Sequence, residues 1–455
     1  MINRLLWRTG ARGPVLAAAV LLLSACSIDK VLEVPDPDVS RPGDLTGTLA
    51  LATLKAAAVG DFQVAFAGTG GLTGLEGLVN ITGLFTDEFF FTETFPTRVQ
   101  IDRRAIDRNN STMLAIYFQA QAARQSAFRA ESVYAKLAPN DSGYSESLSL
   151  EGYAFILLAE SYCSGVPITK VDVSGMVLPG QPLSTQQLLD SAINRFTTAL
   201  TIANSAGSTY LANLALVGQA RALLFKGNGS LAAAATLVQN VPSDFEYRIF
   251  SSDNTDRQNN GVFELQYLEG RWTQADKEGR NGLPFLSAGD PRTPFVDLGA
   301  GFDGAHEVYG SLKYPSRSAS TVLASGVEAE LILAEAALSS NYGGANGTLD
   351  ILNGLRANIG MSPLASAATQ QAQVDQLFSE RAFWLFLTAH RLGDLRRLSR
   401  SVANGGYGRN SETVFPTGGY SGRGGGIYGT DVNFPIPIEE ANSNPNAPAC
   451  LDRNP

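Results

Sequence analysis

The chain has 455 residues and a formal net charge of −9 at pH 7. Hydrophobic residues make up 44% of it and charged residues only 17%, which excludes an intrinsically disordered chain and supplies material for a large core. The acidic balance argues against nucleic acid or an anionic lipid surface as a partner.

The first 26 residues have the parts of a secretory signal. Arg4, Arg8 and Arg12 form a basic start, residues 15–23 are apolar, and small residues lead directly to Cys26. This ending resembles a bacterial lipobox, in which the cysteine thiol receives a diacylglyceryl group before cleavage. We therefore expect residues 1–25 to be a lipoprotein signal peptide and Cys26 to be the lipidated residue. An ordinary signal peptide that happens to end near a cysteine is the alternative.

No later stretch reaches the ~18 uninterrupted apolar residues that a membrane span requires. The lipid on Cys26 is therefore the only attachment to a membrane that we expect, with the folded body in water.

Residues 86–98 alternate carboxylates with aromatic rings. Asp87, Glu88, Phe90 and Arg98 combine flat apolar surface with groups that hydrogen-bond hydroxyls, as a sugar site requires. These four are candidate ligand-binding residues. The alternative is an extended segment whose aromatic face packs inward.

An enzyme is not expected. Asp87 and Glu88 are adjacent on an extended segment and point apart, so they do not predict the facing carboxylates of a glycoside hydrolase. The chain also has no G-x-S-x-G or H-E-x-x-H motif.

Helical periodicity dominates two parts of the chain, residues 111–240 and 322–400. Each of three similar segments places Ala or Gly where two helices approach closely, continues with leucines and is followed by a second helix. Such pairs resemble tetratricopeptide units and predict a mainly α protein whose helix pairs stack into a superhelical scaffold. The expected helices cover residues 113–137, 187–203, 231–238 and 349–357, together with segments that begin at Leu150, Leu216 and Ser325.

The segment 245–321 interrupts these pairs and is rich in Gly, Asn and Asp. Residues 262–267 are typical of a strand, so we expect minor β structure among irregular loops. Trp272 offers the largest face for stacking on a ligand and, with Tyr309, completes the ligand-binding candidates. Contact with a partner protein is the alternative role of this insertion.

Residues 380–397 place charged side chains around a core of large apolar ones. As one helix, this segment would bury its middle and bring Asp394 near His390 at i,i+4 and near Arg391 at i,i+3. We interpret it as an internal clamp, because a catalytic role for His390 and Asp394 lacks a nucleophile or metal partner. The predicted clamp consists of Glu380, Arg381, His390, Arg391 and Asp394.

Two cysteines remain after Cys26 is assigned to the lipid. Cys163 and Cys450 would lie in an oxidising compartment, where an even number of thiols favours a disulfide; two buried free thiols are the alternative. His306 and His390 lack zinc-site spacing, so we expect neither a metal nor a cofactor.

The segment 380–397 also resembles a signature of the SusD/RagB family of outer-membrane lipoproteins, which reads roughly E-R-x(8)-x-H-R-x-x-D-L-R-R. Further segments resemble other parts of that family in the same order, whereas the usual terminal "QNPGY" is replaced here by Ala449-Cys450. The similar segments are 164–167 (SGVP), 329–338 with 352–357 (LNGLRA), 434–440 (FPIPIEE) and 444–446 (NPN).

The resemblance implies a single SusD-like domain over residues 26–455, with loop-rich ligand or partner regions at 60–110, 245–321 and 401–455. It also implies a protein at the outer membrane, facing the cell exterior. Such a protein captures a nutrient oligomer, above all an oligosaccharide, for a TonB-dependent (SusC-like) transporter. A structural partner of that transporter, or a binder of peptides or another nutrient, is the alternative.

Overall fold

The computed structural model describes residues 47–71, 75–171, 176–446 and 449–455. The expected signal peptide and Cys26 lie outside the described residues. Residues Gly47–Pro455 form one compact unit.

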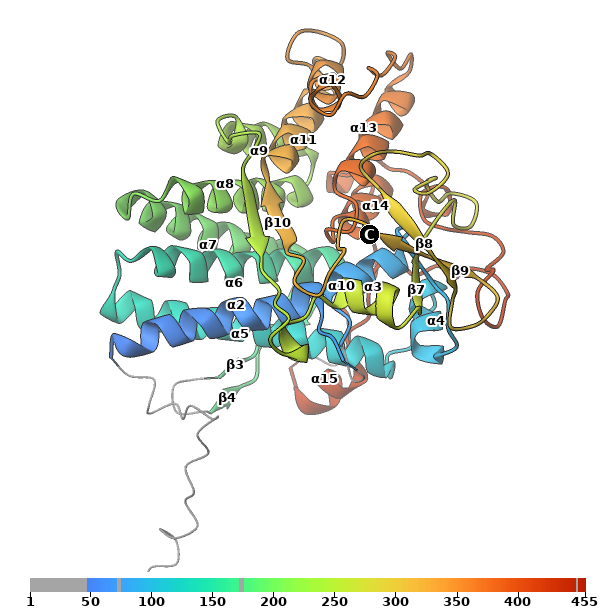
Figure 1. Ribbon diagram of the computed structural model, residues 1–455. Coiled ribbons are helices and arrows are strands. Elements are labelled where there is room, and N and C mark those ends of the chain that lie inside the picture. Colours follow the sequence, from blue (N-terminus) through green and yellow to red (C-terminus); the bar gives the residue numbers. More distant parts are fainter. Residues whose placement is uncertain (1–46, 72–74, 172–175, 447–448) are drawn as a thin grey trace, which may run out of the picture. The chain divides into compact units, whose positions relative to one another are not determined.

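A stack of helices makes up one side of this unit (Figure 1). Each helix packs against its neighbour in the order α5, α6, α7, α8, α9, α11 and α12, as expected for tetratricopeptide-like pairs. The bounds of these helices are α5 Ser111–Leu137, α6 Ser142–Ser161, α7 Thr185–Ser205, α8 Thr209–Lys226, α9 Leu231–Val238, α11 Gly326–Ala337 and α12 Thr348–Asn358.

Side chains at the N-termini fix where these helices begin. Asn110 accepts a hydrogen bond from the Met113 amide of α5 at 3.1 Å, and Ser184 forms a capping box with Gln187 of α7. Each cap satisfies amides that have no partner within the helix, which stabilises the first turn by ~1 kcal/mol.

Glycines let the scaffold helices approach closely around Phe196 of α7. A Cβ atom at Gly152 of α6 would lie 2.7 Å from the Phe196 ring, and one at Gly218 of α8 would lie 2.4 Å from it. The aromatic side chain therefore fills the space that two missing side chains leave, as expected from the small residues in these segments.

The scaffold also contains a helix outside its expected limits. Helix α2 (Leu49–Ala67) packs against α5 and α6, and α3 (Leu78–Phe85) and α4 (Pro96–Asp102) follow it. The region 60–110, predicted to be loop-rich, therefore also contains the end of α2 and all of α3 and α4. By length and composition residues 50–67 of α2 could cross a membrane, but 56% of that window is buried inside the protein, as in a core helix.

Short antiparallel pairs of strands lie among the loops. In the described part of the chain β1 pairs with β7, β6 with β10, β8 with β9, β2 with β5 and β3 with β4. The bounds are β1 Phe89–Phe91, β2 Val166–Pro167, β3 Lys170–Val171, β4 Val177–Leu178, β5 Pro182–Leu183, β6 Glu246–Ile249, β7 Trp272–Gln274, β8 Phe295–Ala300, β9 Glu307–Ser311 and β10 Thr321–Ser325.

Residues 262–267, expected to be a strand, are helical instead. Helix α10 (Gly261–Phe263) runs into a π-helical turn, η5 (Glu264–Leu268). The Asn260 side chain accepts hydrogen bonds from the amides of Val262 and Phe263, and this cap starts a helix where the apolar run alone favours a strand.

The clamp segment is two helices and not one. Helix α13 (Gln370–Trp384) ends before a turn, and α14 (Arg391–Ser399) begins after it. Within the turn Leu387 and Ala389 have φ angles of 52° and 61°, which L residues rarely adopt. Because the chain turns here, the apolar residues 383–387 and the charged residues 390–397 do not lie on one continuous helix.

Cys163 and Cys450 form a disulfide, the pairing that the sequence favoured. The bond joins the end of the α6 segment to the C-terminal tail, whose Leu451 and Asp452 amides also donate to the Ser164 carbonyl. Remaining short elements are η3 Asn228–Ser230, η4 Asp256–Gln258, η6 Val402–Asn404, η7 Ser411–Thr413 and α15 Ile438–Ser443.

Candidate ligand-binding site

The charges of the clamp are all paired, some with each other and some with partners far away in the sequence. Asp394 accepts from Arg381 at 2.8 and 3.0 Å and from Arg397 at 2.8 Å, and Arg391 pairs with Asp87. Burial acts to raise the pKa of Asp394, but the two guanidinium groups outweigh it and hold that pKa well below its ordinary value.

His390 does not pair with Asp394, so that expectation is wrong. Its Nε2 lies 3.1 Å from Oε1 of Glu328 at the start of α11, and its Nδ1 faces the Thr388 hydroxyl at 2.8 Å. Glu380 completes the clamp by pairing with Arg292 at 2.5 Å and Arg356 at 2.7 Å. The clamp thus ties α11, α12, α13 and α14 together.

Two of the predicted ligand-binding residues are internal parts of this clamp. The Asp87 carboxylate receives both arms of the Arg391 guanidinium, and the Leu387 amide donates to Oε1 of Glu88 at 2.8 Å. Both acids are almost wholly buried, and burial raises the pKa of Glu88 to about 8. The prediction that they bind a ligand is wrong. Asp87 pairs with Arg391 of the clamp, and Glu88 accepts from the Leu387 amide of the turn.

Phe90 and Trp272 are also buried. Strand β1 pairs with β7 so that Phe91 lies opposite Trp272, and the indole, 1% exposed, receives the edges of Phe89 and Phe91 at 5.8 Å. Phe90 packs in a cluster with Tyr420 and Tyr428. Neither ring offers a free face, so the alternative of an inward-packed aromatic segment is the correct one.

Arg98 and Tyr309 remain accessible to a ligand. Arg98 pairs with Glu76 at 2.6 Å, and Tyr309 on β9 lies edge-on to Phe295 of β8, with ring centroids 5.5 Å apart. The structure places neither beside the other ligand-binding candidates in a pocket.

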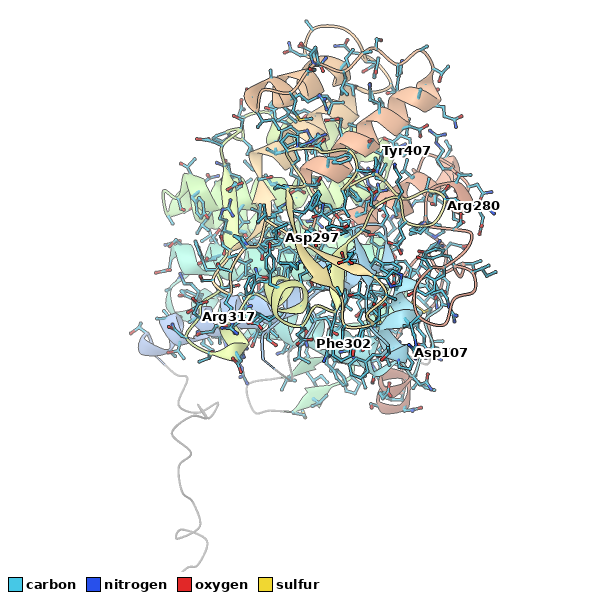
Figure 2. All side chains as sticks on the ribbon, turned by 45° about the vertical axis from the view of Figure 1, so that its right-hand side comes forward. Asp107, Arg280, Asp297, Phe302, Arg317 and Tyr407 are labelled. Carbon is cyan, nitrogen blue, oxygen red and sulfur yellow. A yellow bond between two sulfur atoms is a disulfide. The ribbon has the colours of Figure 1, made fainter. Side chains whose placement is uncertain are left out.

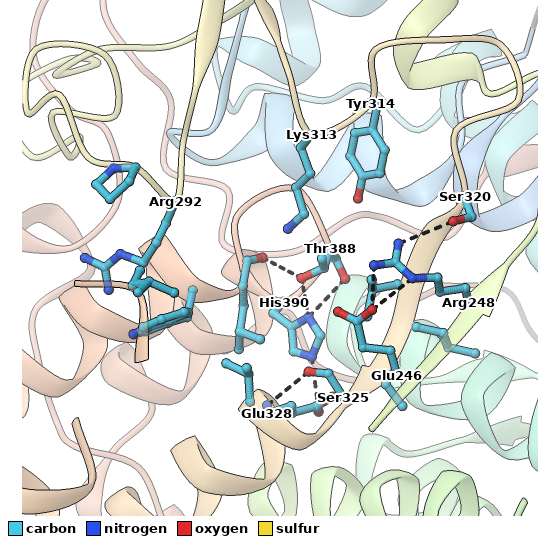
Figure 3. A pocket seen from close by; sticks show the side chains of 18 residues that line it. Glu246, Arg248, Arg292, Lys313, Tyr314, Ser320, Ser325, Glu328, Thr388 and His390 are labelled. Atoms are coloured by element: carbon cyan, nitrogen blue, oxygen red, sulfur yellow. Dashed lines mark hydrogen bonds and ion pairs between the residues drawn. The ribbon is translucent and has the colours of Figure 1, made fainter. Parts of the chain in front are cut away.

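A pocket of about 400 Å³ is lined by residues of the helical scaffold and of the loops (Figure 3). Its walls come from β6, β10, the start of α11 and the turn between α13 and α14. The volume is in the ~300–1,000 Å³ range of small-molecule sites. The clamp and the turn that it holds both contribute to this pocket, since His390 of the clamp and Leu385 and Thr388 of the turn line it.

Trp384 and Tyr314 are the aromatic residues of this pocket, and Trp384 was not among the ligand-binding residues expected from the sequence. Trp384 is only partly buried, and the guanidinium of Arg292 lies 5.0 Å from its ring centroid. Its Nε1 has no hydrogen-bond partner among the described residues. The sequence assigned Trp384 to a fully buried helix core, because the end of α13 at this residue could not be seen there.

Polar groups complete the pocket walls. Arg248 and Glu246 of β6 pair at 2.5 Å, and Arg248 also donates to the Ser320 hydroxyl at 3.3 Å. Lys313 donates from Nζ to the Phe386 carbonyl at 2.5 Å, and burial lowers the pKa of its ammonium to about 8. An aromatic ring, charged groups and hydroxyls thus converge on one space.

A separate apolar surface lies on the β8–β9 hairpin. Phe302 just after β8 is 59% exposed, and Figure 2 shows it and Asp297 on the side that faces the viewer. The Arg271 guanidinium lies 5.0 Å from the Phe302 ring and 5.4 Å from that of Phe95. The other exposed apolar residues of β8 are Phe295, Val296 and Leu298.

No protein-family model and no curated protein matches the chain by sequence. Solved structures do match its fold. A SusD superfamily protein from Parabacteroides distasonis aligns with a TM-score of 0.64 at 15% identity, over 88% of this chain and 98% of its own. A laminarin-binding SusD-like protein aligns with a TM-score of 0.60 at 14% identity, over 88% of this chain and 98% of its own.

Surface glycan-binding protein A from Bacteroides uniformis aligns with a TM-score of 0.61 at 12% identity, over 89% of this chain and 99% of its own. Alignments of this length cover both the helical stack and the loop-rich side. The chain has the SusD superfamily fold, and the resemblance seen in the sequence is confirmed at the level of the fold.

Proposed function

We propose that this protein captures an oligosaccharide in the Trp384 pocket and delivers it to a TonB-dependent transporter of the outer membrane. The observation that carries the proposal is the pocket itself, in which an indole lies among groups that donate and accept hydrogen bonds. Sugar recognition requires flat apolar surface for the C–H face of the ring and polar groups for the hydroxyls.

The fold supports a binding role of this kind. Solved proteins with the same fold carry names that refer to laminarin and to surface glycans. The pocket also has a rigid frame, because the ion pairs of Asp394, Arg391 and Glu380 fix the turn that forms its wall.

Anchoring through lipid on Cys26 would hold the protein at the membrane that contains the transporter. A role as structural partner of the transporter is the second candidate, and the β8–β9 surface favours it. Exposed Phe295, Leu298 and Phe302 form the kind of apolar surface that a stable partner covers.

Trp384→Ala tests the proposed site. We expect it to weaken binding of a glycan by roughly two- to tenfold, measured by calorimetry against a panel of oligosaccharides, since an aromatic stacking contact contributes ~0.5–1.5 kcal/mol. Phe118→Ala on α5 removes an exposed ring outside this pocket and should leave binding unchanged. If no oligosaccharide of the panel binds the intact protein, the oligosaccharide proposal is wrong and the structural role stands.

A further inference from the structure

We infer that the pocket selects an acidic saccharide, with Lys313 pairing with the carboxylate of the sugar. The inference rests on the proposed function and names the class of ligand. It follows from how the charges that line the pocket are paired.

Most charges of the pocket already have partners of opposite sign. Arg292 forms ion pairs with Asp290 at 2.6 Å and with Glu380. Arg248 pairs with Glu246, and His390 lies next to the carboxylate of Glu328. Each of these groups can still orient a hydroxyl, but none has an unpaired charge to offer a ligand.

Lys313 differs from these groups. Its ammonium donates to the neutral carbonyl of Phe386, and among the described residues Glu88 and Glu246 act on it only at longer range, without a hydrogen bond. In Figure 3 the amine points into the pocket between Arg292 on one side and Arg248 on the other. An ammonium in a low-dielectric site without an anion is costly, and a ligand carboxylate would remove that cost.

Two carboxyl groups, those of Glu88 and Glu246, act electrostatically on Lys313, and Glu246 is already paired with Arg248. Burial raises the pKa of Glu88 to about 8, so at pH 7 this carboxyl is mostly protonated. Burial lowers the pKa of Lys313 to about 8 as well, so most of the ammonium remains charged at pH 7. The pocket therefore keeps a positive charge although the whole chain is acidic.

The remaining walls suit the rest of a sugar ring. Trp384 supplies an apolar surface, while the Glu246 and Arg248 pair and the Ser320 hydroxyl supply groups for ring hydroxyls. A hexuronic acid presents these features together, namely one carboxylate, one apolar face and several hydroxyls. Because the protein has a net charge of −9, general attraction of a polyanion cannot account for such binding.

The experiment compares polygalacturonate and alginate with neutral laminarin, using the intact protein and affinity electrophoresis or calorimetry at fixed salt. We expect the polyuronates to bind at least about tenfold more tightly than laminarin. Lys313→Met should remove this preference, and Lys313→Arg, which keeps the charge, should retain it. Thermal unfolding of each variant shows whether the loss of the Phe386 contact has altered the fold.

The pH profile of the wild type provides a second test that needs no variant. Binding of a polyuronate should fall as the pH rises from 7 to 9, because Lys313 loses its charge and Glu88 gains one. In Lys313→Arg the part of this fall that comes from the ammonium should disappear. The other charged or titratable groups that face this site are Glu246, Arg248, Arg292, Tyr314, Glu328 and His390.

Two outcomes separate this inference from the proposed function. If laminarin binds as tightly as the polyuronates, depends on Trp384 and is unaffected by Lys313→Met, the acidic ligand is wrong and the glycan-binding function stands. If neither class of glycan binds, the proposed function fails and the inference fails with it.

Discussion

Arg391 and Asp87, 304 positions apart in the chain, form a two-pronged ion pair with N–O distances of 2.6 and 2.8 Å. The pair joins the start of α14 to the segment between α3 and β1, and both side chains are buried. The two stretches of sequence that were most notable for their charges are therefore partners of each other. Their contact sets the position of the turn that lines the Trp384 pocket.

Breaking this pair should destabilise the protein strongly. Arg391→Met leaves the Asp87 carboxylate buried without its cation, and we expect a loss of ~3–5 kcal/mol in the free energy of unfolding, measured by urea denaturation. Arg257→Met is the matched control, because its pair with Asp61 is exposed and should contribute at most ~1 kcal/mol. Equal losses in the two variants would contradict the structural role of the buried pair.

Two glycine substitutions should have opposite effects. Gly218→Ala places a methyl group against the Phe196 ring and should cost ~1–3 kcal/mol through overpacking. Gly354→Ala lies in α12 with no atom near the new Cβ, and should stabilise the protein by ~0.5–1 kcal/mol because alanine favours the helix. Thermal unfolding of both variants measures the contrast. A stabilising effect at Gly218 would refute the close packing of α7 against α8.

Glu88 should make stability fall as the pH rises. Its pKa is about 8 in the folded protein against 4.5 ordinarily, so its stabilising contribution is complete below pH 4.5. That contribution decreases between pH 4.5 and 8, because only the unfolded chain has released the proton. Glu88→Gln keeps an acceptor for the Leu387 amide and should remove a slope of up to about 1.4 kcal/mol per pH unit.

Urea denaturation from pH 5 to 8 measures this slope. Asp394 does not contribute in that interval, since its pKa is lowered and it is ionised in both states. Glu307 is an exposed glutamate on β9, and Glu307→Gln is the control that shows whether removal of any carboxylate alters the slope. An unchanged slope in Glu88→Gln would mean that Glu88 is ionised in the folded protein.

Cys26→Ser should abolish lipid labelling and release the protein from the membrane fraction. The thiol is the expected site of the diacylglyceryl group, and the serine hydroxyl does not replace it. Metabolic labelling with a radioactive fatty acid, followed by membrane fractionation, measures both effects. Cys163→Ser is the control that should remain labelled, and continued labelling of Cys26→Ser would exclude the lipobox assignment.

Much of the helical scaffold could be predicted because its signals are local. The expected helix at residues 231–238 matches α9, and residues 187–203 fall within α7, whose Ser184 and Gln187 cap is readable from the sequence. Helix α2 was missed because its alanines carry little periodic contrast between buried and exposed faces. The strand expected at residues 262–267 failed because the side chain of Asn260 starts a helix there.

The candidate site could not be predicted in the same way. Trp272 and Trp384 look alike as isolated indoles, but the pairing of β1 with β7 buries the first, whereas the second lies at the end of α13 beside a turn. Lys313 follows β9, and Arg248 belongs to β6, so only folding brings them to the same pocket.

The sequence by itself determined the helical class, the resemblance to the SusD/RagB family and the charged segment that holds the core together, because local periodicity and caps specify these features. The tertiary structure decided which acids pair with that segment and which tryptophan is accessible. The physical reason is that a buried charge takes whichever partner the packed chain brings within reach, and for Arg391 this is Asp87, far away in the sequence.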